Sequence, residues 1–600
     1  MAKSKFWRFI DGYDAHTSHA VGKSFIDLSY SGAVNQRMKR AATFRISSLA
    51  RRVTELFAYT STKSYGAGSL AFGILTLILH FAGNYFGAYA EAETTTLIIG
   101  IVFSVLSVPL LLVDRPLCVL LQDIPITDFI LYEFFCIKRV SRREGVPSIH
   151  PLIAICLCAL PPLLGYFVPL WTVVLAIAAL VFVYVTLTSP EFSFIATLLV
   201  LPYLNYLPYT EIVFLALVLV TLVSFLRKVA YGKRVLHIEQ YDLLIGLFVL
   251  SILVSGIFVK GVESFTGSLG MLVLSFGYVL TSNMVTNRRL ADRVINAFVI
   301  SSVPAGVIAV SEFVRAAFDG SGLSAISVGA GSSFGDPAVY AAFLVIVLPL
   351  TVALLGQSRG MLRVFYSLVL ILNTGAVILT AERFAWLALL LGVFIYFAHK
   401  APYASPLVVC MLAVFPYVLF LFPSEALSTV FSNTLNGLSV DELSELWQAA
   451  TGVFSDNALL GIGIGEECFA EEFSGLGFAG VTNSHNLFLE IGLEAGIVAL
   501  ASLVLLIIVR FRHRSVYKSY VKDSQLSLIS TMTAIAITCL IILGTTYYLF
   551  ENMAILYLFW FVFGLGSAAL RVAKREHDDK ILYYEDIESP DSSVADIKIR

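Results

Sequence analysis

The sequence predicts an all-α, polytopic integral membrane protein with about 14–16 transmembrane helices and one long outward-facing loop that contains short helices. Two observations support this prediction. Apolar residues make up 58% of the 600 residues, and charged residues only 14%. Apolar stretches of roughly 20 residues, the length that crosses a ~30 Å hydrocarbon core as a helix, recur along most of the chain. We therefore expect the lipid bilayer to surround the chain, and nothing in the sequence supports nucleic-acid binding.

The predicted spans divide the chain into an ordered series of segments. We expect a basic cytoplasmic arm at 1–67, two extra transmembrane helices with an interfacial segment at 68–150, a transmembrane core at 151–422, a long extracytoplasmic loop at 423–485, the last three transmembrane helices at 486–575, and a disordered cytoplasmic tail at 576–600. The candidate spans are 68–88, 94–113, 151–168, 171–188, 191–207, 210–226, 241–259, 265–285, 294–314, 337–356, 364–381, 384–399, 402–422, 486–509, 527–547 and 553–570. Residues 116–136 are broken by Pro125 and two aspartates, which favours an interfacial or re-entrant piece.

Basic residues set the predicted orientation, because Lys and Arg collect on the cytoplasmic side of a membrane. The first 67 residues contain eleven Lys and Arg, and the later basic clusters fall in connections on that same side of the predicted spans. The loop at 423–485 falls on the opposite side and has nine acidic residues but no Lys or Arg. We therefore expect this loop to face outward and both termini to be cytoplasmic.

The outward-facing loop contains two distinct patterns. In "DELSELWQAATGVF", apolar residues at helical spacing predict an amphipathic helix on the outer membrane surface; they are Leu443, Leu446, Trp447, Ala450 and Phe454. In "NALLGIGIGEECFAEEF", the GxGxG spacing lacks the flanking strand and helix of a dinucleotide fingerprint. A tight turn is therefore the favoured interpretation, and an anion-cradling loop is the alternative. Cys468 is the single cysteine of the loop, so neither a disulfide nor a zinc-type cluster is expected there.

The loop ends in "VTNSHNLFLEIGLEAGIV", a polar cluster at the start of an apolar span. His485 lies at the helix start, where the positive end of the helix dipole disfavours imidazolium, so we expect a neutral histidine that can accept a proton. Asn483 and Ser484 are the expected N-cap residues, and simple helix capping is the alternative role for His485.

Three further polar residues of this cluster, Asn486, Glu490 and Glu494, are spaced by four and share one helix face. Glu494 would lie ~13 Å below His485 at 1.5 Å per residue. A carboxylate at that depth is either functional or hydrogen-bonded to a neighbouring helix, and the sequence leaves both roles open.

Two arginines are expected on the outer side, against the usual bias for this residue. Arg383 follows Glu382 in the turn of a predicted hairpin at 364–399, and Arg315 ends an earlier span. An arginine on that side can bind an anion, whereas an interfacial ion pair between Glu382 and Arg383 is the alternative.

Four segments carry a family resemblance, in the order "FGDPAVYAAFLVIVLPL", "TAERFAWLALLLGV", "LWQAATGVFSDNALLGIGIGEECF" and "SHNLFLEIGLEAGIVAL". Together they resemble the O-antigen ligase and O-antigen polymerase superfamily of polytopic bacterial glycan transferases, over about residues 330–510. Arg383 and Trp386 match the Ser-Arg-Gly-Ala-Trp helix start of that family. Asp336 and Ala338 replace the asparagines of its Asn-Pro-Asn segment. The family usually has an arginine shortly before the loop tryptophan, and "VDELSELW" has none.

The resemblance implies a membrane glycosyltransferase in the inner (cytoplasmic) membrane of a bacterial cell. Its donor would be a polyprenyl-diphosphate-linked oligosaccharide, and its acceptor a sugar, lipid or protein hydroxyl. Arg383 would bind the departing diphosphate, and His485 would act as the general base. The candidate substrate-binding residues are Asn486, Trp447, Arg315 and Glu490. No metal or other cofactor is implied.

Three functions stay open at this point. We favour a polymerase that joins lipid-linked units into a surface polysaccharide. A ligase that moves a finished glycan onto a lipid or protein shares the same motifs. A transporter or flippase without covalent chemistry is the third, and it should show symmetric halves and broken helices that meet at the midplane.

Overall fold

The computed structural model describes residues 52–86, 94–140, 148–165, 167–207, 209–230, 234, 236–238, 242–259, 261–321, 329–400, 434–435, 438–478, 480–517 and 524–588. These residues are helical apart from loops and one antiparallel pair of two-residue strands, β1 (Thr434–Leu435) and β2 (Leu438–Ser439). Among the described helices, eleven are long and apolar enough to cross a membrane, and three more are apolar but shorter. The predicted class, an all-α polytopic membrane protein, is therefore confirmed.

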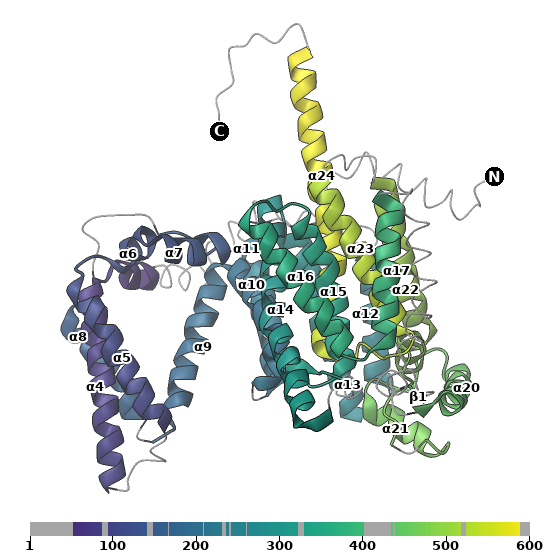
Figure 1. The fold of residues 1–600 in the computed structure, drawn as a ribbon, viewed down its shortest axis with the longest axis horizontal. Helices are drawn as coiled ribbons and strands as arrows, with labels where there is room; N and C mark the ends of the chain where they lie inside the picture. Colours follow the sequence, from purple (N-terminus) through teal and green to yellow (C-terminus); the bar gives the residue numbers. More distant parts are fainter. Residues whose placement is uncertain are drawn as a thin grey trace. The chain divides into compact units, whose positions relative to one another are not determined.

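The described residues divide into two compact units, of which the smaller comprises those from 52 to 194 and from 220 to 234. Its helices are α4 (Thr62–Phe86), α5 (Thr94–Leu112), α6 (Leu117–Asp123), α7 (Pro125–Thr127), the π-helix η2 (Asp128–Phe134), α8 (Pro151–Leu164) and α9 (Leu170–Thr188). Helix α4 packs along α5 and α8, and α6 and α7 run crosswise to these helices (Figure 1). As predicted, Pro125 interrupts the segment that follows α5, because it begins a new helix.

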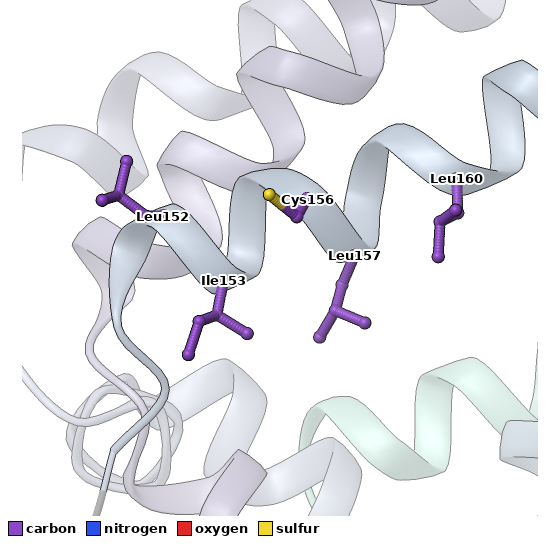
Figure 2. Close-up of a pocket in the computed structure, with 5 residues that line it drawn as sticks. All are labelled: Leu152, Ile153, Cys156, Leu157 and Leu160. Carbon is purple, nitrogen blue, oxygen red and sulfur yellow. The ribbon is translucent and has the colours of Figure 1, made fainter.

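One face of α8 is apolar and exposed. Five of its residues line a hollow of about 370 Å³ (Figure 2): Leu152, Ile153, Cys156, Leu157 and Leu160. All five belong to one helix and none carries a charge, as a surface in contact with lipid requires. This hollow therefore brings no polar chemistry together.

The larger unit comprises the described residues from 195 to 219 and from 236 onward, so the division falls inside α10 (Pro190–Val200) and α11 (Thr210–Ala230). Its other elements are the 3-10 helix η3 (Leu201–Tyr206), α12 (Asp242–Phe258), α13 (Gly261–Met284), α14 (Arg288–Ala316), the π-helix η4 (Ala317–Ser321), the 3-10 helix η6 (Ser332–Phe334), α15 (Pro337–Leu355), α16 (Met361–Leu379), α17 (Arg383–Lys400), α20 (Val440–Asp456), α21 (Glu466–Ser474), α22 (Leu487–Tyr517), α23 (Ser524–Gly544) and α24 (Met553–Glu588). The most buried spans are those of α15 and α24, which are 83% and 94% buried. Phe298 of α14 packs against Phe343 of α15 and Phe561 of α24, so these three helices form the centre of the unit.

The helices of the larger unit alternate in direction, and its two ends carry different residues. At one end, Nε of Arg288 lies 3.0 and 2.9 Å from the carboxylate oxygens of Glu576, and Arg571 donates to the Ser282 carbonyl at 2.9 Å. At the opposite end α22 and α24 begin, α23 ends, and α20 and α21 are attached (Figure 1). We call this opposite end the loop end.

Three expectations about the spans need comment. The expected span at 191–207 is divided into α10 and η3, because Pro202 has no N–H group to continue an α-helix. The expected span at 402–422 and the arm up to residue 51 lie outside the described residues. The disorder predicted for 576–600 is wrong for its first part, because α24 continues to Glu588.

Candidate functional site

The turn between α23 and α24, residues 545–552, reaches the segment that contains the predicted arginine. Tyr547 OH donates to Glu382 Oε1 at 3.1 Å, and Glu382 directly precedes Arg383 at the start of α17. Arg383 is half-buried there. The turn therefore fixes the position of Glu382, the residue next to the arginine that is predicted to bind the diphosphate.

The same turn also holds the segment that contains the predicted histidine. Asn483 Nδ2 donates to Glu551 Oε2 at 2.7 Å, and Asn486 Nδ2 donates to the Thr545 carbonyl at 3.1 Å. These two asparagines lie on either side of His485 along the chain. One turn thus anchors both predicted functional segments at the loop end of the larger unit.

His485 has a left-handed backbone conformation, with φ 53°. Three side chains fix this local fold: Asn483 Oδ1 accepts from His485 N at 2.9 Å, Glu490 Oε2 accepts from Ser484 N at 2.6 Å, and Trp447 Nε1 donates to the Ser484 carbonyl at 2.9 Å. Left-handed non-glycine residues cost roughly 1–3 kcal/mol and cluster at functional sites. Through these hydrogen bonds, the predicted substrate-binding residues Trp447 and Glu490 contact the peptide units next to His485. Glu490 itself is buried.

The N-cap of α22 is one residue later than His485. Asn486 Oδ1 accepts from Phe488 N at 3.0 Å and from Leu489 N at 3.2 Å, the capping pattern of a helix start. The expectation that Asn483 and Ser484 cap this helix is therefore wrong. His485 is half-buried, and this burial lowers the pKa of its imidazole, which favours the neutral form.

The start of α17 shows a similar local strain. Ala381 also has a left-handed conformation, with φ 58°, and Trp386 Nε1 donates to the Val377 carbonyl at 2.8 Å, which fastens α17 to the end of α16. Burial raises the pKa of Glu382 to about 7, although the hydrogen bond from Tyr547 opposes that shift. Glu382 therefore keeps its proton to a higher pH than an exposed carboxylate does.

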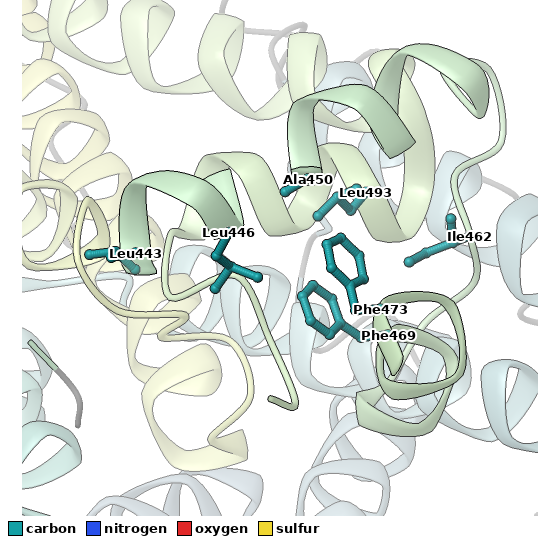
Figure 3. Close-up of a cluster of buried hydrophobic side chains, with 7 residues drawn as sticks. All are labelled: Leu443, Leu446, Ala450, Ile462, Phe469, Phe473 and Leu493. Atoms are coloured by element: carbon teal, nitrogen blue, oxygen red, sulfur yellow. The ribbon is translucent and has the colours of Figure 1, made fainter. Parts of the chain in front are cut away.

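The predicted amphipathic helix is confirmed as α20, but its apolar face packs against protein. Seven buried residues form the loop core (Figure 3): Leu443, Leu446, Ala450, Ile462, Phe469, Phe473 and Leu493. They come from α20, α21, the glycine-rich segment and the first part of α22. Phe469 and Phe473 stack with ring centroids 4.0 Å apart. The loop core therefore fixes α20 against α22, instead of leaving it on a membrane surface.

The glycine-rich segment forms the predicted tight turn, with φ values of 77°, 102° and 112° at Gly461, Gly463 and Gly465. It packs into a break in α22, where Gly496 leaves the helical conformation (φ 77°, ψ −176°). Ile462 N donates to the Leu493 carbonyl at 2.7 Å.

The other backbone groups exposed by the break in α22 also find partners. Ile497 N donates to the Ala458 carbonyl at 2.7 Å, and Ser255 Oγ donates to the Glu494 carbonyl at 2.6 Å. Non-helical backbone at membrane depth is tolerated where protein satisfies its polar groups in this way.

Glu494 is buried at this break and is hydrogen-bonded to two other segments. Its Oε1 accepts from Gly465 N at 3.2 Å, and its Oε2 accepts from Tyr548 OH at 2.5 Å. Of the two roles that the sequence left open, the structure shows the hydrogen-bonded one. Glu494 links the glycine-rich turn, α22 and the 545–552 turn.

Carboxylates dominate the electrostatics of the loop end. Burial, together with the nearby Glu466 and Asp336, raises the pKa of Glu551 to about 7. Asp336 also raises the pKa of Glu382, so it lies within electrostatic reach of both carboxylates. Within the described ranges, no three His, Cys, Asp or Glu side chains are grouped so that they could hold a metal ion.

The remaining predicted residues lie at the starts or ends of helices. Asp336 caps α15, accepting from Ala338 N at 2.7 Å, and Pro337 is its first residue, as the sequence indicated. Arg315 is exposed near the end of α14, and no hydrogen bond or ion pair between described residues joins it to the groups above.

Sequence reasoning missed the residues that connect this site: Tyr547, Tyr548 and Glu551. Their signal was present as "TTYYLFEN", a polar and aromatic turn between two spans on the same side as the long loop. A turn this short carries no family motif, so only its contacts reveal its place.

The fold and this polar site define a polytopic helical membrane protein whose hydrogen-bonded polar residues gather at one end of the bundle. Residues 366–504 match the family model described as O-antigen ligase. This match supports the assignment of the chain to the O-antigen ligase and polymerase superfamily, as the ordered motifs predicted, and with it a role in membrane glycan transfer. The matched region contains Arg383, Trp447, His485 and Glu490. The comparison with curated proteins found no match.

Proposed function

We propose that the protein is a membrane glycosyltransferase that joins polyprenyl-diphosphate-linked oligosaccharide units into a surface polysaccharide at the outer face of a bacterial inner membrane. The observation that carries this proposal is the 545–552 turn, which hydrogen-bonds on one side to Glu382, next to Arg383, and on the other to the two asparagines flanking His485. The acidic loop lacks Lys and Arg, so the positive-inside rule favours an outer loop end and cytoplasmic termini.

Arg383 is the proposed ligand of the donor diphosphate. Departure of a diphosphate leaves negative charge, which a guanidinium stabilises through paired hydrogen bonds. The family's usual loop arginine is absent here, and Arg315 has no described contact with the site. Arg383 therefore carries the main cationic role in this proposal.

His485 is the proposed general base. A base for a sugar hydroxyl must be unprotonated at working pH, and burial keeps the imidazole of His485 in that form. Attack by the acceptor oxygen on the anomeric carbon breaks the bond to the diphosphate, while His485 takes the hydroxyl proton. Such a single displacement inverts the anomeric centre.

A ligase is the second candidate function, and the description of the matched family favours it. In that case the same residues would transfer one finished glycan to a lipid or protein hydroxyl. The two candidates differ in the acceptor and in the number of units added, and they share the chemistry at Arg383 and His485.

The test uses purified full-length protein and the lipid-diphosphate oligosaccharide that accumulates in cells lacking it, with products separated on a gel. A ladder of products supports the polymerase. A single new species that needs an added acceptor supports the ligase, and the absence of any new glycosidic bond refutes both.

Two His485 variants sharpen this test. His485→Ala should abolish transfer with membrane insertion intact. His485→Asn should abolish transfer as well. Asparagine tolerates the left-handed backbone of this position, so backbone strain could not explain that loss of transfer. Gln448→Ala, an exposed change on α20, is the matched control. Undiminished transfer by His485→Asn would remove His485 from the role of base.

A further inference from the structure

A cavity of about 190 Å³ lies at the loop end of the larger unit, among η3, the start of α11, η6 and the start of α24. Five polar residues line it: Asn205, Thr210, Glu211, Glu551 and Asn552. The volume is below the range of pockets for drug-sized ligands, so it suits one small group, such as a single sugar ring. None of the residues predicted from the sequence lines this cavity.

Hydrogen bonds already formed within the chain decide which polar groups remain for a ligand. Asn552 Oδ1 caps α24, accepting from Ala554 N at 3.0 Å, so its Nδ2 is left as a donor. Asn205 Nδ2 donates to the Phe334 carbonyl at 2.7 Å, so its Oδ1 is left as an acceptor. Glu211 forms no hydrogen bond or ion pair with the described part of the chain. The cavity thus offers both acceptors and a donor.

The charge and the apolar wall of the cavity indicate which class of ligand it can bind. It is lined by two carboxylates and by no Lys or Arg, which disfavours a phosphate or diphosphate. Sugar hydroxyls can donate to carboxylates in charge-assisted hydrogen bonds. Phe214 and Phe334 are buried in its wall and add apolar surface, as in other small-molecule sites.

Glu551 connects this cavity to the proposed base. It lines the cavity and also accepts from Asn483 Nδ2 at 2.7 Å, and Asn483 Oδ1 accepts from His485 N. A group bound in the cavity therefore lies beside Glu551, whose partner Asn483 accepts from the His485 amide.

We propose that this cavity is a subsite for an uncharged sugar residue of the acceptor glycan, separate from the cationic position of the donor diphosphate. The proposal rests on the proposed glycosyl transfer for its biological meaning, and its test measures binding without transfer. Glu211 and Asn552 supply an acceptor and a donor to the sugar hydroxyls. Glu551 lines the cavity and is hydrogen-bonded to Asn483, two residues before His485 in the chain.

The experiment titrates the full-length protein in lipid nanodiscs with free oligosaccharide, followed by calorimetry. The probe is the saccharide released by mild acid from the lipid-linked units of cells lacking the protein, so it carries no diphosphate. Glu211→Gln keeps the shape of the side chain, and Asn552→Asp keeps the helix cap but loses the Nδ2 donor. Glu211→Gln should weaken binding about tenfold or more, the size expected for a hydrogen bond that involves a charged group. Asn552→Asp should weaken it about threefold to tenfold, the size expected for a neutral hydrogen bond.

Two controls accompany these variants. Asp456→Asn removes an exposed carboxylate of α20 outside the cavity and should leave binding unchanged. Arg383→Gln should also leave binding of the free saccharide unchanged, because that residue is assigned to the diphosphate. Melting temperatures close to that of the wild type would show that the variants are folded.

The outcomes separate this inference from the proposed function. Wild-type protein that fails to bind the saccharide, or Glu211→Gln and Asn552→Asp variants that bind like wild type, would overturn the subsite even if transfer proceeds. Wild-type protein that binds the saccharide through these residues but forms no glycosidic bond would support the subsite and refute the glycosyltransferase.

Discussion

Replacing Gly496 with alanine tests whether the glycine-rich turn and the break in α22 hold each other in place. Gly496 has φ 77° and ψ −176°, a region that essentially only glycine occupies. A Cβ at this position would lie 2.6 Å from the carbonyl carbon of Leu459 and 2.9 Å from the oxygen of Ala458. Both contacts are with backbone, so the turn itself must move to admit the methyl group.

The expected loss of stability has two parts. Backbone strain at such a position costs about 1–3 kcal/mol for a residue other than glycine. Movement of the turn would lengthen the hydrogen bonds Ile462 N to Leu493 O and Ile497 N to Ala458 O, both 2.7 Å. Each is worth about 1 kcal/mol, so the total is about 3–5 kcal/mol.

Thermal unfolding of the purified full-length protein, followed by the transfer assay, measures this effect. Gly375→Ala is the matched control, because it lies within α16 and its added Cβ would meet no heavy atom within 4 Å. We expect Gly496→Ala to unfold at a clearly lower temperature and to transfer poorly, since Glu494 and the loop core adjoin the break. Equal melting temperatures and activities for the two variants would refute the reasoning.

Three smaller predictions concern the groups around His485 and Arg383. Glu490→Ala should reduce transfer far more than Glu490→Gln, because only glutamine keeps an acceptor for the buried Ser484 amide. Leaving that amide without an acceptor costs about 1–3 kcal/mol. Equal activities of the two variants would contradict this prediction. Stability should fall as pH rises from 5 to 7, because the folded protein keeps the Glu382 proton up to about pH 7 while its ordinary pKa is 4.5. In thermal unfolding, Glu382→Gln should remove part of this fall in stability; the rest remains because the pKa of Glu551 is raised as well. An unchanged dependence of stability on pH would exclude Glu382 as a cause. Tyr547→Phe removes a hydrogen bond that favours the charged carboxylate, so the fall should extend to higher pH, and a move to lower pH would count against this assignment.

Most spans could be predicted because hydropathy and length are local properties of the sequence. All but two of the expected spans have a matching helix, one of the two being outside the described residues. The start of α15 was equally readable, since the expected span begins at Pro337, the first residue of the helix. The same holds for the tight turn at Gly461, Gly463 and Gly465, where positive φ favours glycine.

The candidate site could be predicted only in part. The sequence indicated His485 and Arg383 but gave the cap of α22 to the wrong residues, because Asn483 uses its side-chain oxygen on the His485 amide and leaves capping to Asn486. It also placed the apolar face of α20 on a membrane, because an amphipathic pattern does not distinguish lipid from a neighbouring helix. The assignment of Arg383 and His485 to catalysis stays a prediction.

The sequence by itself determined the helical membrane class, the long acidic loop and the order of motifs that indicates glycan transfer, because each depends on residues close together in the chain. Only the tertiary structure decided how these parts meet. The break at Gly496 is filled by a turn more than thirty residues earlier, and Glu494 is satisfied by Gly465 and Tyr548 from opposite sides in sequence. Such bonds form between segments that hydropathy cannot relate, so the 545–552 turn emerged as the connection between the two predicted segments only from its contacts.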